Sequence, residues 1–258
     1  MTGTDQLRVA LAVEWVKFRR ARPVWTATAL LTVGVIALSV ATLASVGGAN
    51  PAVASKAQYL VDGGGQDGLF AAASTIVSVG GMLGFGVVAG WVFGREFTEG
   101  TITGLWATPV ARPVIATAKL LLLSAWSVVT TVVLAVALTV AALFADPGTL
   151  GADVVALVGK FTAIALLTAG LAIPCAWVAT VGRGYLPAIG AIIAVVLVAQ
   201  MAVMAGLGGW FPFAAPGVWA AGTQAGTVTG AQLALTLMVP AIFAALTIRS
   251  WRRLTLTR

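Results

Sequence analysis

The chain contains no histidine and a single cysteine, Cys175. It therefore lacks the side chain used most often for acid–base chemistry near neutral pH and for binding transition metals. One cysteine cannot form an intrachain disulfide, and we interpret Cys175 as a packing residue. Serine nucleophiles would also lack an activating base. The sequence predicts no catalytic residue, no cofactor site and no metal site in this chain.

Charge is scarce as well, since 9% of the 258 residues are charged and 60% are hydrophobic. No soluble core of this size requires so many apolar residues, so the sequence predicts an integral membrane protein. Crossing the hydrocarbon core takes about 20 apolar residues. Such runs lie near 24–46, 69–93, 119–144, 158–180, 185–205 and 231–248. We predict an all-α fold with six transmembrane helices, in a single transmembrane domain over 1–258 with a bundle over 24–248.

Acidic residues are missing from all six predicted spans, and Lys160 is the only basic residue near the core of one. Ion-coupled carriers usually keep charges at mid-membrane, so energy is expected to come from another subunit. The nearest approach to a phosphate-binding loop is Gly159-Lys160, but Phe161 stands where Ser or Thr is needed and Val154 where the first glycine belongs. We expect no ATPase motif. An ion-coupled secondary carrier and a non-transporting membrane partner or immunity subunit remain the alternatives.

The basic residues are sorted by membrane side, which argues against a nucleic-acid partner despite the net charge of +7. With an even number of spans both termini share one side, and 13 of the 15 basic residues fall on it: Arg8, Lys17, Arg19, Arg20, Arg22, Arg95, Arg112, Lys119, Arg183, Arg249, Arg252, Arg253 and Arg258. Lys56 and Lys160 fall opposite. The positive-inside rule then predicts cytoplasmic termini, including a basic tail over 249–258.

The segment before the first span, within residues 1–23, reads as an amphipathic helix. Leu7, Leu11, Trp15 and Phe18 recur at helical spacing, with the basic residues mostly off that stripe. This pattern predicts a helix lying on the inner leaflet. The alternative is a basic topology anchor without a partner.

Small residues and prolines mark the later helices. Gly80 and Gly84 lie four apart, and Gly86 and Gly90 repeat that spacing, which lets a neighbouring helix approach closely. Packing within the chain and a subunit interface explain this equally well. Proline is expected to interrupt three spans, at Pro174, Pro187 and Pro240.

The stretch 206–232 carries no charge but contains two prolines and many glycines. We predict short helices that re-enter the outer leaflet between the fifth and sixth helices, where protein can satisfy irregular backbone. A neutral exposed loop is the alternative.

A polar island over 94–119 follows the second span. Glu96 and Glu99 lie three residues apart on one helical face, and Gly100-Thr101 can end that turn. The pattern predicts a compact cytoplasmic hairpin that acts as a rigid knob. The alternative is that its arginines are topology signals and its glutamates neutralise them.

The run Arg95-Glu96-Phe97-Thr98-Glu99-Gly100-Thr101, followed by Pro109-Val110-Ala111-Arg112 and Lys119, resembles the signature of type-2 permeases of ATP-binding-cassette (ABC) exporters. The amphipathic helix with Glu14 and Lys17, the six spans and the uncharged segment between the last two are also similar. One departure is Ala111, where a serine is common before the arginine.

The resemblance implies a permease that pairs with a second permease chain and with two cytoplasmic ATPase subunits, which would hold ATP and Mg²⁺. It implies a coupling helix after the second span, with these residues in contact or positioning roles: Arg95, Glu96, Phe97, Glu99, Gly100, Thr101, Pro109 and Arg112. It also implies a second ATPase contact through Glu14, Lys17 and Arg20. Together with the apolar composition, it predicts export of a hydrophobic or amphipathic antibiotic, lipid-like molecule or peptide across a bacterial plasma membrane.

Overall fold

A computed structural model of the chain describes residues 2–46, 48, 50–61, 64–145, 152–222 and 227–255. Arg258 therefore lies outside the described residues. The elements, in order, are α1 (Gly3–Arg19), α2 (Arg22–Ser45), α3 (Pro51–Leu60), α4 (Gly65–Ile76), the π-helical turn η1 (Val77–Gly81), α5 (Met82–Thr98), the 3₁₀ helix η2 (Thr101–Ala107), α6 (Arg112–Ala145), α7 (Ala152–Gly170), α8 (Pro174–Val181), α9 (Tyr185–Met204), α10 (Ala215–Ala220) and α11 (Gly230–Arg252). The described residues form no β-strand, so the predicted all-α class is confirmed.

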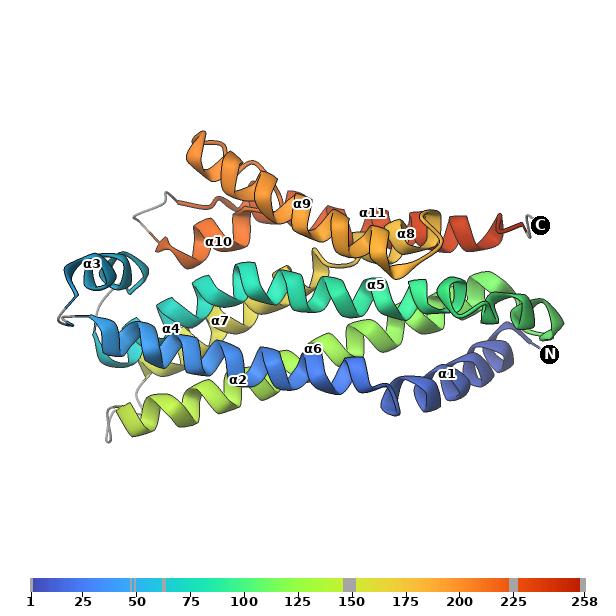
Figure 1. The fold of residues 1–258 in the computed structure, drawn as a ribbon, viewed down its shortest axis with the longest axis horizontal. Helices are drawn as coiled ribbons and strands as arrows, with labels where there is room; N and C mark the ends of the chain where they lie inside the picture. Colours follow the sequence, from blue (N-terminus) through green and yellow to red (C-terminus); the bar gives the residue numbers. More distant parts are fainter. Residues whose placement is uncertain are drawn as a thin grey trace.

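Six helical stretches are long and apolar enough to cross a membrane, as the sequence predicted. They are Arg22–Ser45, Gly65–Thr98, Arg112–Phe144, Asp153–Val181, Tyr185–Met204 and Gly230–Arg252. Several extend beyond the apolar runs, because polar residues continue the helices past the hydrophobic part. Both termini and the α5–α6 connection lie at one end of the molecule, which we call the terminal end; α3 and α10 lie at the opposite end (Figure 1). This arrangement fits an even number of crossings.

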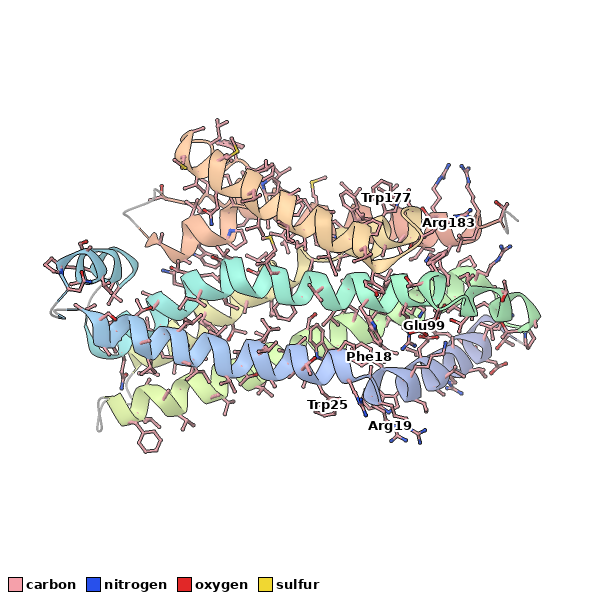
Figure 2. The ribbon with its side chains drawn as sticks, viewed as in Figure 1. Phe18, Arg19, Trp25, Glu99, Trp177 and Arg183 are labelled. Carbon is pink, nitrogen blue, oxygen red and sulfur yellow. The ribbon has the colours of Figure 1, made fainter. Side chains whose placement is uncertain are left out.

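The predicted amino-terminal helix is present as α1, but the residues that it buries differ from those of the predicted apolar stripe. A capping box between Thr2 and Asp5 starts it. The buried side chains are Ala10, Glu14 and Phe18, and the helix packs against α6. Trp15 is 52% exposed, so this part of the apolar stripe faces away from the bundle. Glu14 takes an inward position and meets charged partners there. Figure 2 shows Phe18 on the bundle side of this helix and Arg19 on its outer side.

The second span, formed by α4, η1 and α5, is the most deeply buried of the six. Cβ atoms added at Gly86 and Gly90 would lie 2.7 Å from Ile192 and Ala188 of α9, so these glycines allow close packing within the chain. Gly84 instead faces Leu31 of α2. A Cβ at Gly80 would meet no atom within 4 Å, so Gly80 has no such packing role among the described residues.

Proline positions agree only partly with the expected interruptions. Pro174 begins α8 directly after the turn that separates it from α7, and Pro240 lies inside α11. Pro187 lies in the first turn of α9, where its missing N–H costs no helical hydrogen bond, so its predicted interruption of the span was wrong. In the described part of 206–232, turns lead into the short helix α10, which packs against α4, α7 and η1.

Candidate functional site

The α5–α6 connection begins where Gly100 adopts the left-handed conformation, with φ of +69°. Glycine tolerates this conformation without a Cβ clash, and it ends α5 after Thr98. The chain then forms η2 and enters α6 at Arg112, followed by Pro113 in the first turn. The expected compact hairpin is thus a 3₁₀ helix between two long α-helices. We call residues 99–111 the elbow.

Beneath the elbow, four charged side chains from three helices form one ion cluster: Glu14 and Lys17 of α1, Glu96 of α5 and Lys119 of α6. The Lys119 ammonium lies 2.9 Å from Glu14 Oε2 and 2.9 Å from Glu96 Oε1. The Lys17 ammonium lies 2.7 Å from Glu14 Oε1 and 3.1 Å from Glu96 Oε1. Each carboxylate is thus shared by both ammonium groups, which ties α1 to α5 and α6.

The cluster is buried and electrically neutral. Glu14 is 5%, Glu96 2% and Lys119 1% exposed, while Lys17 closes the solvent side. Lys119 donates a third hydrogen bond, to the Val92 carbonyl at 3.2 Å. Burying charges costs several kcal/mol each, which pairing with good geometry offsets, whereas removing one partner leaves a charge stranded. The cluster therefore fixes the positions of α1, α5 and α6 relative to one another more than it adds net stability.

Electrostatics within the cluster favour the charged forms of the α1 residues. Burial alone would raise the pKa of Glu14, but the ammonium groups of Lys119 and Lys17 outweigh it and hold that pKa below its usual value. Burial alone would lower the pKa of Lys17, but Glu96 and Glu14 outweigh it and raise that pKa. Both groups remain ionised across the physiological range.

The carboxyl end of α11 closes the cluster on another side through Trp251, which is fully buried. Its ring packs edge to face against Phe93 and Phe97, with centroids 5.9 and 6.5 Å away, and lies 5.9 Å from the Lys119 ammonium. Its Nε1 donates to Thr180 Oγ1 of α8 at 3.0 Å. Five helices therefore converge at this point.

Two further contacts hold the elbow from outside. The Ala111 N–H donates to Gln6 Oε1 of α1 at 3.3 Å. The Gln6 side chain, which is distant in sequence, thus accepts a hydrogen bond from the backbone just before α6. At this position the chain has Ala111 in place of the serine that is common there. On the other flank, Arg112 donates to the Leu254 carbonyl in the carboxyl-terminal tail.

The residues predicted as coupling contacts separate into an exposed set and an internal set. Glu99, Gly100, Thr101, Pro109 and Arg20 are exposed. Phe97 is partly buried against Trp251, and Arg95 lies over the Trp91 ring at 4.7 Å. Figure 2 shows Glu99 at the same end as α1.

Glu14 and Glu96 belong to the internal set. Their side chains are buried in the ion cluster, so neither presents a carboxylate to a partner surface in this conformation. The expected partner contact through Glu14 is therefore corrected to an internal one, and of the two roles considered for Glu96 the geometry favours positioning.

Two members of the cluster lie where the helices continue beyond or begin the predicted apolar runs. Lys119, the first residue of the predicted run 119–144, is buried two turns inside α6, and Glu96, beyond the end of the predicted run 69–93, lies in the last turn of α5. A lysine well inside a predicted membrane helix is itself a signal of function or of a buried partner. Gln6, Trp251 and Leu254 carried no such signal, because their roles depend on contacts across more than a hundred residues of sequence or between chain ends.

The comparison with known families agrees with this architecture. A family model described as ABC-2 family transporter protein matches residues 10–200. The chain belongs to this family. Among curated proteins, no sequence matches the chain. The family match covers α1 from residue 10, the elbow and the membrane helices as far as residue 200 in α9, so it includes all four members of the ion cluster. The ABC-2 chain is a multi-pass membrane transport component that associates with ABC ATPase partners.

Proposed function

We propose that this ABC-2 chain is the permease subunit of an ATP-driven bacterial exporter, with both termini and the elbow in the cytoplasm. Two separate ATPase subunits would bind and hydrolyse ATP with Mg²⁺. Two permease chains, identical or closely related, would enclose the path. The observation that carries the proposal is the buried ion cluster, which joins an exposed cytoplasmic elbow to α1, α5 and α6.

The elbow is suited to receive force. Its exposed residues Glu99, Gly100, Thr101 and Pro109 form the surface that a partner would touch. Directly behind them, Glu96 and Lys119 connect the two helices that leave the elbow, at 2.9 Å. A push on the elbow would move α5 and α6 together with α1, because separating them would strand buried charges.

The proposed cargo is hydrophobic or amphipathic. A cavity of about 260 Å³ lies where α4, η1 and α5 meet α9 and α10, toward the end away from the termini. Its lining is mostly apolar, with Thr75, Ser78 and Gln200 as polar groups and no charged side chain. Such a lining gives a strongly charged solute no counter-charge, whereas apolar molecules with a few hydrogen-bonding groups would fit.

Charge reversal on the elbow surface tests the coupling role. The chain would be reconstituted in vesicles with its ABC ATPase partner, and cargo-stimulated ATP hydrolysis would be measured. Glu99→Lys should lower the stimulated rate at least about ten-fold, as expected when a contact charge is reversed. Because Glu99 is exposed, folding should not change.

The matched control is Asp153→Lys, an exposed charge reversal at the other end of the molecule. It should leave stimulated hydrolysis near the wild-type rate. Equal rates for Glu99→Lys and wild type would refute the contact. Transport by the chain alone under an ion gradient would instead establish a secondary carrier.

A further inference from the structure

A second cavity, distinct from the apolar one, is lined by residues of α4, α7 and α10. These elements approach one another at the end of the molecule opposite the termini (Figure 1). We call this cavity the outer cleft. It has a volume of about 330 Å³ and is lined by Asp67, Phe70, Ala71, Ser74, Leu157, Lys160 and Ala220. Unlike the apolar cavity, it carries one acidic and one basic side chain.

Neither charge of the outer cleft is used by the fold. Among the described residues, no ion pair or hydrogen bond involves the side chain of Asp67 or Lys160. Ser74 is 3% exposed, yet its hydroxyl also has no hydrogen-bond partner there and it lines the cleft. Asp67 is exposed and Lys160 is half-buried, so both charges are open to a ligand that enters the cleft. These three groups therefore form a polar surface without an internal partner.

The geometry favours a ligand that carries both charges. Asp67 lies in the first turn of α4, whereas Ser74 is about 10 Å deeper along that helix at 1.5 Å per residue. Lys160 lies about 12 Å along α7 from its start at Ala152. An ion of one sign would be attracted by one residue and repelled by the other. A zwitterion can satisfy both.

We propose that the outer cleft binds a zwitterionic group in which an ammonium is joined by a short linker to a phosphate. The ammonium would face the Asp67 carboxylate, and the phosphate would accept from Lys160 and Ser74. The volume leaves room for roughly ten non-hydrogen atoms, judged against about 30 Å³ per water. This is enough for the phosphoethanolamine headgroup, and Phe70 and Leu157 give the cleft an apolar wall suited to the glycerol carbons that follow it in a phosphatidylethanolamine. This site is independent of the proposed transport function.

The test is lipid retention by the full chain. Nanodiscs would contain equal amounts of phosphatidylethanolamine and phosphatidylglycerol, and native mass spectrometry would measure which lipid stays bound after release. Wild type should retain phosphatidylethanolamine about five-fold over phosphatidylglycerol, the size of one favourable exposed ion pair. Asp67→Asn should bring the ratio close to one, because only phosphatidylethanolamine carries the ammonium. Lys160→Gln should lower the retention of both lipids, because both carry the phosphate. Asp153→Asn, at the same end but outside the cleft, should keep the wild-type ratio.

A charge swap provides an independent check on folding artefacts. Asp67→Lys combined with Lys160→Asp retains both charges and should recover part of the preference that Asp67→Asn loses. Soluble phosphoethanolamine distinguishes the source: displacement of the lipid would show that the headgroup suffices, and no displacement would show that acyl contacts are needed. Absence of a preference in wild type, or a preference unchanged in Asp67→Asn, would overturn the proposal.

Discussion

The two ends of the molecule carry the same kinds of charged residue, but these residues are paired at one end and unpaired at the other in the described part of the chain. At the terminal end, Glu14, Lys17, Glu96 and Lys119 pair with one another in a buried cluster, and Trp251 closes it. At the opposite end, Asp67 and Lys160 line a cavity without pairing in the described part of the chain. Internal pairing sets a rigid register between helices, whereas unpaired charges are available to a ligand. The contrast supports the proposed coupling role of the terminal end and the proposed ligand binding at the outer cleft.

The largest effect should come from removing the central cation at the terminal end. Lys119→Met leaves two carboxylates buried beside one half-exposed ammonium, and should destabilise the protein by about 3–5 kcal/mol. The same substitution at the opposite end, Lys160→Met, should change stability by less than about 0.5 kcal/mol, because no internal pair is lost. Thermal unfolding in detergent measures both.

A neutral cluster separates charge loss from packing loss in that experiment. Adding Glu14→Gln and Glu96→Gln to Lys119→Met removes the stranded charges and should recover most of the lost stability. The triple variant could instead have a melting temperature as low as that of the single variant. In that case side-chain packing, and not uncompensated charge, would hold the terminal end together. The contrast between the two ends would then have no electrostatic basis.

A smaller effect is expected from close backbone packing beside the cluster. A Cβ at Gly94 would lie 2.4 Å from the backbone nitrogen of Tyr185, so Gly94→Ala must push the α8–α9 turn away from α5. Overpacking of this kind costs about 1–3 kcal/mol. Gly190→Ala in α9, where an added Cβ meets nothing within 4 Å, is the matched control and should be neutral or slightly stabilising. Equal melting temperatures for the two variants would contradict rigid packing here.

The difference between the ends also shows what could be predicted from sequence. Six apolar runs determine six helices, because hydrocarbon thickness sets their length. The polar island was found because charges between spans are conspicuous, and Gly100 ends α5 as its residue type suggests. The buried roles of Glu14 and Lys119 were missed, since pairing between α1 and α6 depends on which faces meet, and periodicity alone does not specify partners. The outer cleft was missed for the same reason: Asp67 and Lys160 lie 93 positions apart in sequence.

The smallest effect concerns pH, and it separates the ends again. The pKa of Glu14 is lowered from 4.5, so its ionised form stabilises the fold above that pH, and the contribution is lost as pH falls through the lowered value. The pKa of Lys17 is raised from 10.5, so its contribution is complete below that pH and is lost as pH rises through the raised value. Between about pH 6 and 9 these two groups should leave stability constant.

Glu14→Gln should flatten the acid side of the profile of melting temperature against pH, because the titrating carboxyl is gone. If the melting temperature of the variant fell with acid pH as steeply as that of wild type, acid unfolding would begin at another group. The cluster would then fix the positions of the helices without being the pH-sensitive part of the terminal end.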